Sequence, residues 1–386
     1  MVKFDPRKFD PRKKDEVLCG IRAHGEGELI ELEQRFIDGR QLPLVLQVVR
    51  GRDAGIDDIV ACLREHKAEI GTLLDRHGAL LLRGFDALDS APRFAAVLDV
   101  LASRLLDYVG GTSPRQTVHG QILTATDMPS NYSIPMHQEM SYTASAPDGV
   151  AFFCETAPDE GGETTIADAR VVTSRISPDV RTRFDAKGVR LRRTLPTLES
   201  VHLKPGVQKP WTEVFATTDR DEVGRIASEK GWEVSWLPDN SVQLWQEILP
   251  ASKTHPRTAE RVWFNQTHVF APEGTIRWAE RDERNEQLAV LRRLLAEHPE
   301  MVDGVFHGDG TQVSAEDAEH IWDVHQRSEI PVAWRPSDVL LLDNVLAMHG
   351  RRSFRGVRRV LAGLIRNETA TATGQPSRAA AAAAAE

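Results

Sequence analysis

The chain has 386 residues, a net charge of −9 at pH 7, 41% apolar residues and 27% charged residues. This composition is typical of a globular protein, the negative charge argues against a nucleic-acid partner, and no apolar run is long enough for a membrane span. The three cysteines, Cys19, Cys62 and Cys154, are far apart in the sequence. We therefore expect a cytoplasmic protein without a disulfide framework.

Both ends of the chain have a composition that argues against packing into a core. Residues 4–13 contain the unit FDPRK twice, each copy with a proline and charges, so we expect a flexible arm over 1–20. The alanine-rich segment 369–386 has no amphipathic face and is predicted to be a disordered tail. Between them we expect a single domain over residues 21–368.

Helices are predicted where apolar residues recur at helical spacing. Gly78 is expected to end the first of them, and Ser314 to cap the last, with Asp317 at its third position. The predicted helices cover residues 57–77, 91–107, 283–298 and 314–327.

Strands are predicted mainly in the later part of the chain. Helices early, strands late and a helical insertion between strands favour an α+β fold with a central β-sandwich and no βα alternation. The insertion covers about residues 196–262, and its Trp211, Trp232 and Trp236 are predicted either to form a lid or to pack on the surface. The predicted strands lie at 79–85, 150–157, 164–169, 189–195, 233–237, 242–248, 261–270, 330–334, 338–344 and 358–367.

The segment IPMHQEMSY (134–142) places His137 and Glu139 two residues apart. On a strand, such a pair points to the same face, so an imidazole and a carboxylate can reach one metal ion. Two histidines and one carboxylate form the facial triad of non-haem iron oxygenases. The third ligand is predicted to be His349, which follows the apolar strand at 339–342, with His268 as a competing ligand; each lone histidine is also compatible with ordinary core packing.

A co-substrate site is predicted from two further residues. An oxygenase of this type needs an electron donor such as 2-oxoglutarate, whose distal carboxylate suits a bidentate arginine. Arg359 follows His349 by ten residues, and Thr164 in GGETTIAD offers a hydroxyl donor.

The segments MHQEMSY, GGET and DNVLAMHGRRSFRGVRR together resemble the taurine dioxygenase and clavaminate synthase-like family of Fe(II)/2-oxoglutarate oxygenases. The resemblance implies a double-stranded β-helix, or jelly roll, flanked by helices. It implies that His137, Glu139 and His349 bind iron, and that Thr164 and Arg359 bind 2-oxoglutarate. It also implies that O₂ and 2-oxoglutarate are consumed, with release of succinate and CO₂. A glutamate at position 139 favours hydroxylation, desaturation or epoxidation over halogenation.

The segment HQEMSYTASAPDGVAFFCETAPDEGGETTIADAR is similar to amino-acid β-hydroxylases of nonribosomal peptide pathways. The resemblance therefore implies hydroxylation of an unactivated C–H bond in an amino-acid-derived substrate. Relatives that take free acids carry a second arginine four residues after the first, where this chain has Gly363. A substrate tethered to a peptidyl carrier protein is one explanation, and another acid-binding residue is the alternative.

Residues beside the motifs are candidates for contacting the substrate, and each is also a candidate for supporting the metal ligands. They are Gln121, Asn131, Tyr142 and Arg352.

Two other functions compete with a biosynthetic hydroxylase. One is a catabolic dioxygenase for a free sulfonate or carboxylate, and the other is a metal-binding jelly roll without turnover. The pair Thr164 and Arg359 argues against the latter, because a simple metal binder needs no co-substrate clamp.

Overall fold

The computed structural model describes most of the chain, in the ranges 21–22, 30–37, 39–108, 114–200 and 209–367. The expected arm and tail, 1–20 and 369–386, lie outside the described residues and stay predictions.

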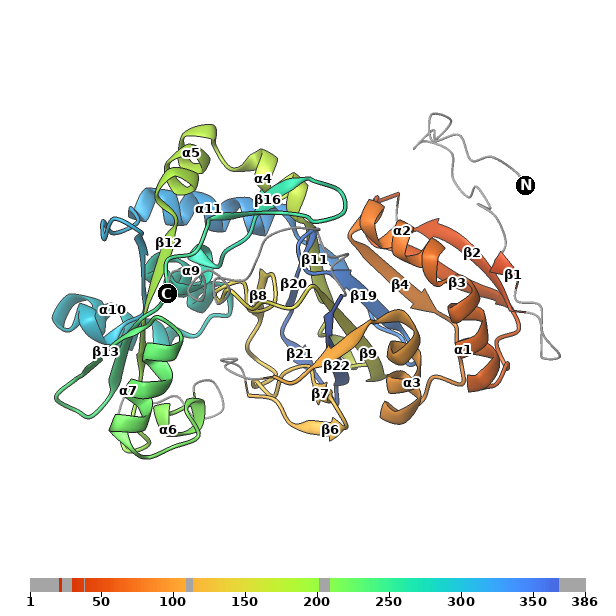
Figure 1. Cartoon of the computed structure of the whole chain (residues 1–386), viewed down its shortest axis with the longest axis horizontal. Coiled ribbons are helices and arrows are strands. Elements are labelled where there is room, and N and C mark those ends of the chain that lie inside the picture. Colours follow the sequence, from red (N-terminus) through yellow and green to blue (C-terminus); the bar gives the residue numbers. More distant parts are fainter. Residues whose placement is uncertain (1–20, 23–29, 38, 109–113, 201–208, 368–386) are drawn as a thin grey trace, which may run out of the picture.

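A sheet of ten strands forms the larger layer of the fold (Figure 1). Its order is β1-β2-β3-β4-β19-β9-β22-β7-β6, and β5 pairs with β22. The central strands β4, β19 and β9 carry buried side chains along almost their whole length, so the sheet is covered on both faces. The bounds are β1 Ile21–Arg22, β2 Glu31–Phe36, β3 Leu44–Arg50, β4 Ala79–Arg83, β5 Arg104–Leu106, β6 Thr117–His119, β7 Ile122–Thr124, β9 Gly149–Thr156, β19 Val339–Asp343 and β22 Arg359–Arg366.

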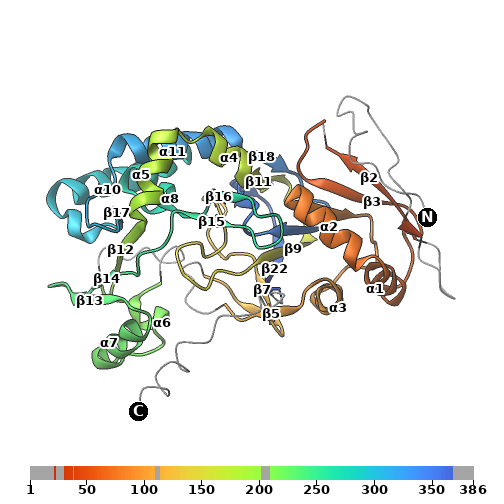
Figure 2. The same ribbon diagram turned by 45° about the horizontal axis from the view of Figure 1, so that its top comes forward.

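Three helices, α1 Ile56–Glu65, α2 Lys67–His77 and α3 Ala91–Leu101, lie along one side of this sheet (Figures 1 and 2). Their apolar residues, such as Ile59 and Phe94, share one core with Phe153 and Leu361 of the sheet. Phe94 stacks on Phe153 with ring centroids 5.2 Å apart. This core covers the outer face of the larger sheet.

A second sheet of four strands, in the order β18-β11-β20-β8, lies on the other side of the larger sheet. Apolar residues of both sheets, such as Met136, Ile166 and Met348 facing Phe152 and Leu340, belong to one core cluster. The two sheets therefore form a sandwich, as predicted. The bounds are β8 Ile134–His137, β11 Thr164–Asp168, β18 Ile330–Val332 and β20 Ala347–Arg351.

A third sheet lies at the far end of the molecule from α1 and α2 (Figures 1 and 2). Its order is β13-β14-β12-β17, and it packs with two helices around a small core of its own that includes Trp211, Val223 and Leu244. We call these elements the satellite sheet. The bounds are β12 Val189–Leu195, α6 Trp211–Val214, α7 Arg220–Glu229, β13 Glu233–Trp236, β14 Val242–Trp245 and β17 Gly304–His307.

Further helices and two small two-stranded sheets complete the described part of the fold. They are β10 Glu160–Gly161 with β21 Phe354–Arg355, β15 Ser252–Thr254 with β16 Arg261–Trp263, α4 Ala169–Arg175, α5 Pro178–Lys187, α8 Thr267–Phe270, α9 Pro272–Arg281, α10 Asn285–Glu297, the 3-10 helix Pro299–Met301 and α11 Ala315–Ser328.

Several predicted elements are confirmed. Gly78 ends α2 in the left-handed conformation, with φ of 74°, and the Ser314 side chain accepts a hydrogen bond from the Asp317 backbone N–H at the start of α11. Most predicted strands occur within one or two residues of their expected bounds. Local signals such as caps and buried apolar runs therefore predicted these elements well.

Other predictions were wrong where tertiary pairing decides the structure. The helix predicted over 91–107 ends at Leu101, because 104–106 pairs with β22. The segment 261–270 is a strand only to Trp263 and then becomes α8. One parallel pair was not expected: β3 and β4 pair in parallel across α1 and α2, although the pairs β4–β19, β19–β9 and β9–β22 are antiparallel, as the lack of βα alternation predicted.

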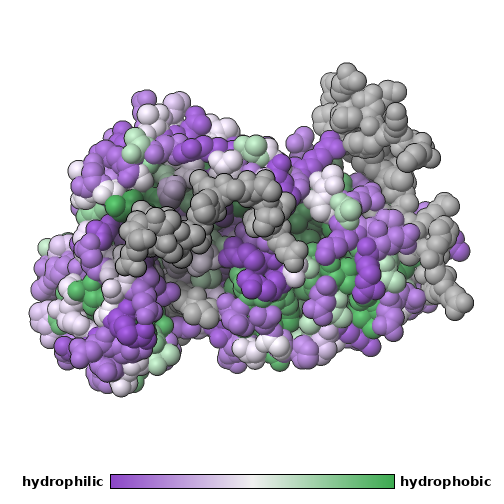
Figure 3. All heavy atoms as spheres, in the orientation of Figure 1, coloured by the Kyte–Doolittle hydropathy of each residue, from purple (hydrophilic) through white to green (hydrophobic). Residues whose placement is uncertain are grey.

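Polar and apolar residues are mixed over the face shown in Figure 3. The exposed large apolar side chains are scattered over different elements, as Val49, Val171, Leu198, Ile248, Val290 and Val357 show. Among the described residues, no helix is both long and apolar enough to cross a membrane.

Candidate metal centre and substrate cavity

Two histidines face each other on neighbouring strands of the smaller sheet. His137 ends β8, and His349 lies directly opposite it on β20. Their ring centroids are 4.4 Å apart, between the two sheets, and His349 also contacts the Phe152 ring at 5.0 Å. Gly350 permits this close approach, because a Cβ there would lie 2.5 Å from the Ile134 carbonyl oxygen.

Glu139 completes a group of three possible metal ligands. One ligand atom from each of His137, Glu139 and His349 lies within 4.8 Å of the others. The His349 Nε2 and Glu139 Oε2 atoms are 3.5 Å apart, and both side chains are buried. The structure therefore brings together the three residues that the sequence singled out, in the set of donors that suits non-haem iron.

Asn344 fixes the backbone of Glu139. Its Oδ1 accepts a hydrogen bond from the Glu139 N–H at 2.7 Å, and its Nδ2 donates to the Glu139 carbonyl at 2.9 Å. The same amide group donates to the Pro147 carbonyl at 2.8 Å. Because Asn344 is buried, these bonds fix the backbone from which the Glu139 carboxylate projects.

The environment of His137 favours a neutral imidazole. Burial, aided by the neighbouring His349, lowers the pKa of His137 to about 4. Its Nδ1 lies 2.9 Å from the Pro135 carbonyl oxygen, and because a carbonyl oxygen only accepts hydrogen bonds, Nδ1 must carry the proton. The proton therefore belongs on Nδ1, and the Nε2 lone pair is left for a metal ion.

Arg115 is a buried cation in this site that sequence reasoning missed. Its Nη2 donates to Glu139 Oε2 at 2.7 Å. Burial alone would raise the pKa of Glu139, but Arg115 outweighs this and holds the pKa below its usual value. Among the described residues, no acceptor bonds the buried Nε and Nη1 groups of Arg115, so these groups can donate to an anionic ligand.

A narrow cavity of about 40 Å³ lies on one side of the two histidines and contains Thr164 and Arg358. The Thr164 Oγ1 accepts a hydrogen bond from Trp334 Nε1 at 3.1 Å. Its own O–H is then free to donate to a ligand in the cavity. Trp334 is a second supporting residue that sequence reasoning missed.

Arg359 does not reach this cavity, which corrects the sequence-based expectation. Its side chain is 49% exposed and pairs with Glu155. The preceding residue, Arg358, lines the cavity instead, and among the described residues its guanidinium donates one hydrogen bond, to the Gly162 carbonyl at 3.0 Å. Burial, aided by the positive charge of Arg351, lowers the pKa of Arg358 to about 9. A buried cation in this situation needs an anion.

The alternation of β22 explains the correction. Val360, Ala362 and Leu364 belong to the core between the two sheets, whereas Leu361 belongs to the core under α1 to α3. Even-numbered residues of this strand therefore face the sandwich interior. Gly363 faces Leu98 of α3, so its lack of a side chain says nothing about the substrate.

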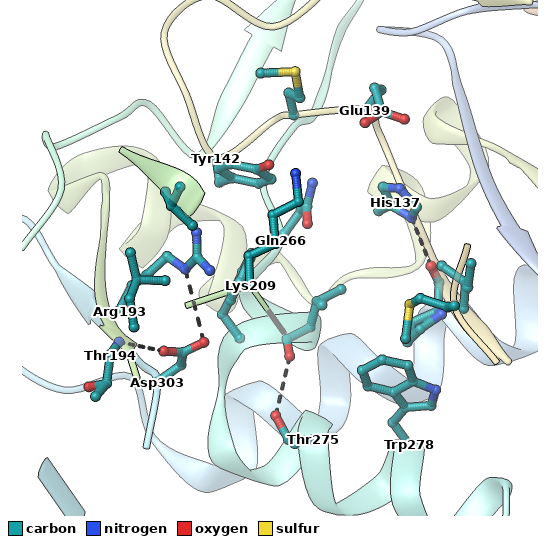
Figure 4. Close-up of a pocket in the computed structure, with 18 of the residues that line it drawn as sticks. His137, Glu139, Tyr142, Arg193, Thr194, Lys209, Gln266, Thr275, Trp278 and Asp303 are labelled. Atoms are coloured by element: carbon teal, nitrogen blue, oxygen red, sulfur yellow. Dashed lines mark hydrogen bonds and ion pairs between the residues drawn. The ribbon is translucent and has the colours of Figure 1, made fainter. Parts of the chain in front are cut away.

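A larger cavity of about 190 Å³ lies beside His137 and Glu139 (Figure 4). Tyr142 lines it and is buried, whereas three other candidates for substrate contact lie elsewhere. Gln121 bonds Asp107 near the surface, Asn131 is exposed, and Arg352 pairs with Glu329.

Two further expectations change. His268, the competing ligand, is not part of the group of three; its Nε2 lies 2.6 Å from the Met136 carbonyl oxygen and its ring stacks on His325. The tryptophans of the insertion do not line the cavity; Trp211 and Trp236 pack against each other, with ring centroids 5.0 Å apart. Other residues of the insertion, Lys209 and Val214, do line it.

Comparison with known proteins identifies the class. Residues 42–365 match the family of taurine catabolism dioxygenase TauD and TfdA, so the chain belongs to the TauD/TfdA family. The dapdiamide synthesis protein DdaC of Enterobacter agglomerans is 30% identical over 315 residues, 81% of this chain and 88% of that protein. A clavaminate synthase-like protein of Arabidopsis thaliana is 31% identical over 305 residues, 78% and 86% of the two chains.

A solved structure supports the same fold. AAD-2 in complex with Mn(II) and N-oxalylglycine matches with a TM-score of 0.52 at 11% identity, over 87% of this chain and 98% of that one. The expectation of a dioxygenase that depends on Fe(II), 2-oxoglutarate and O₂ is thereby confirmed at the level of the family.

Proposed function

We propose that this protein is a hydroxylase in which His137, Glu139 and His349 hold Fe(II). The supporting observation is the group of three ligand atoms within 4.8 Å, between the two sheets. The iron supplies oxidation of a C–H bond, coupled to conversion of 2-oxoglutarate to succinate and CO₂. Arg115 and Asn344 serve as positioning residues, because one bonds the Glu139 carboxylate and the other its backbone.

The 2-oxoglutarate site is proposed to be the narrow cavity that contains Thr164 and Arg358. This is the observation that carries the proposal, because Arg358 is a buried cation without an anionic partner among the described residues. A guanidinium fork binds a carboxylate through two parallel hydrogen bonds, and the Thr164 hydroxyl adds a third donor. The unpaired N–H groups of Arg115 lie in the same cavity.

The substrate is proposed to be derived from an amino acid, and the setting to be natural-product biosynthesis. The similarity to a dapdiamide synthesis protein over 88% of that protein supports this setting. The sequence favoured a carrier-bound substrate because Gly363 replaces a second arginine. That reason no longer holds, because Gly363 faces α3 and not the cavity. We also propose that the sandwich is a double-stranded β-helix with the satellite sheet as an insertion, which the match to AAD-2 supports.

Adjacent arginines offer a sharp test of the co-substrate site. We expect Arg358→Gln to weaken 2-oxoglutarate binding about 30-fold or more, because a buried charge-assisted pair is lost. Arg359→Gln is the matched control and should bind 2-oxoglutarate like the parent protein. Binding is measured by anaerobic titration of the Fe(II) protein, through the visible charge-transfer band of the chelate.

The opposite result, with Arg359→Gln defective and Arg358→Gln unchanged, would restore the sequence-based assignment. Failure of the iron-loaded parent protein to form the band would refute the proposed co-substrate site altogether.

A further inference from the structure

The cavity beside the metal ligands has a charged wall at its far side. Figure 4 shows Arg193 and Asp303 on the side away from His137 and Glu139, with Lys209 drawn between the two groups. All five side chains line the same space of about 190 Å³. A small molecule in this cavity therefore has the metal ligands on one side and fixed charges on the other.

Arg193 is nearly buried but has no hydrogen-bond partner among the described residues. Its side chain is 11% exposed, and its Nε is buried without an acceptor. The nearest acid is Asp303, whose Oδ2 lies 4.0 Å from Nε, too far for a hydrogen bond. The buried Arg83, by contrast, bonds both oxygens of Asp338. Among the described residues Arg193 thus has one long ion pair, to Asp303, and none of the hydrogen-bond acceptors that a buried guanidinium requires.

The guanidinium group is also held in place. It lies 5.2 Å from the ring centroid of Phe270 and 5.9 Å from that of Tyr142. Its backbone belongs to β12, which is paired with β14 through Leu244. A planar cation fixed by aromatic rings and a strand is pre-organised to bind a carboxylate through two hydrogen bonds.

Asp303 offers a complementary acceptor. Its Oδ1 accepts a hydrogen bond from the Thr194 N–H at 2.8 Å, which fixes the carboxylate just before β17. Its Oδ2 lies toward Arg193 at 4.0 Å and has no hydrogen bond among the described residues. The side chain is 24% exposed, so this oxygen can receive an ammonium group from a ligand.

On the basis of the proposed function, we infer that the substrate is a free α-amino acid, whose carboxylate binds Arg193 and whose ammonium group binds Asp303. An α-amino acid carries both charges on one carbon, so a single head group can contact both side chains, whose Nε and Oδ2 atoms are 4.0 Å apart. The amino-acid side chain then extends toward His137 and Glu139, so a side-chain carbon is oxidised. A thioester on a carrier protein has no carboxylate and would leave Arg193 unpaired.

The test uses the iron protein with 2-oxoglutarate under anaerobic conditions. A set of free L-amino acids is titrated, with the methyl ester, the N-acetyl derivative and the N-acetylcysteamine thioester of each. Binding next to the metal is measured as a shift of the charge-transfer band. We expect a free amino acid to bind best, and its ester and thioester to bind about 30-fold or more weakly.

Arginines on the same strand supply the matched variants. Arg193→Gln is expected to raise the Kd of the free amino acid about 30-fold or more and to leave the band itself intact. Arg190→Gln is the control, since Arg190 pairs with Glu233 outside the cavity. A thioester that binds more tightly than the free acid would overturn the inference, and so would unchanged binding in Arg193→Gln. Loss of the band in the parent protein would instead refute the proposed function.

Discussion

At the scale of single residues, the candidate site depends on side chains that contact the proposed metal ligands as well as on those ligands. Glu139 is held by Arg115 at its carboxylate and by Asn344 at its backbone. His137 is oriented by the Pro135 carbonyl. These contacts orient Glu139 and His137 before any metal ion binds, which lowers the free-energy cost of binding it.

We expect Asn344→Ala to weaken Fe(II) binding about 10- to 100-fold, because the Glu139 backbone loses two hydrogen bonds. Asn265→Ala is a suitable control, since Asn265 is also buried and bonds the backbone, at Ala251 and Thr267, without touching a metal ligand. Anaerobic equilibrium dialysis gives the two affinities. Equal affinities in the two variants would show that Asn344 only stabilises the fold.

At the scale of elements, two helices meet through a pair of buried histidines. His268 of α8 stacks on His325 of α11 with ring centroids 3.6 Å apart. Burial lowers the pKa of His325 to about 4, and burial together with His325 holds the pKa of His268 well below its usual value. Both rings are therefore neutral in the folded protein at neutral pH.

This pair makes the fold sensitive to acid. Between pH 6.5 and about 4, an unfolded histidine binds a proton that folded His325 does not, so the free energy of unfolding falls as the pH falls. The expected slope is about 1.4 kcal/mol per pH unit for each such histidine. In His325→Gln the loss between pH 6.5 and 4.5 should be about 2 kcal/mol smaller.

Urea unfolding of the parent and His325→Gln proteins at several pH values measures this difference. Identical slopes in the two proteins would mean that other groups cause the acid sensitivity. The comparison is unaffected by carboxylates, because both proteins contain the same ones.

At the scale of the whole molecule, the described residues contain two groups of possible metal ligands. The second consists of Asp75, His255 and Asp343. Arg257 lies within this group, with its Nε 2.7 Å from Asp75 and its Nη2 3.3 Å from Asp343. The acids are thus neutralised internally, and we expect the metal ion to bind at the first group.

Mn(II) provides a redox-stable probe of this expectation. At about 100 times its Kd, it should stabilise the folded protein by about 2.7 kcal/mol, seen as a rise in Tm. His349→Ala should lose this rise, whereas His255→Asn should keep it. If Mn(II) still raised the Tm of His349→Ala, the metal ion would have to bind outside the group of His137, Glu139 and His349.

The sequence predicted local features of the site and missed those that depend on strand geometry. His137 and Glu139 were recognisable by their spacing. The choice between Arg358 and Arg359 was not, because β22 is apolar on both faces and its pairing with β9 shifts register between Arg359 and Val360. Periodicity could not tell which arginine faces inward.

Contacts between residues far apart in the sequence could not be predicted from it either. Arg193 and Asp303 come together only because β12 pairs with β17. Arg115 gave no signal, since neither a motif nor the apolar pattern singles it out. Caps and buried strands, in contrast, are determined within a few residues and were predicted correctly.

The way the satellite sheet is anchored has a consequence for how this protein can evolve. Val189 and Leu191 of β12 pack in the core between the two sheets, whereas Leu195 at the end of the same strand belongs to the satellite core around Val223 and Leu244. Leu195 and Val214, which packs against that satellite core, also line the larger cavity. Substitutions at these two positions can therefore reshape the cavity wall with little effect on the core that carries β8 and β20, because sites without shared partners act additively.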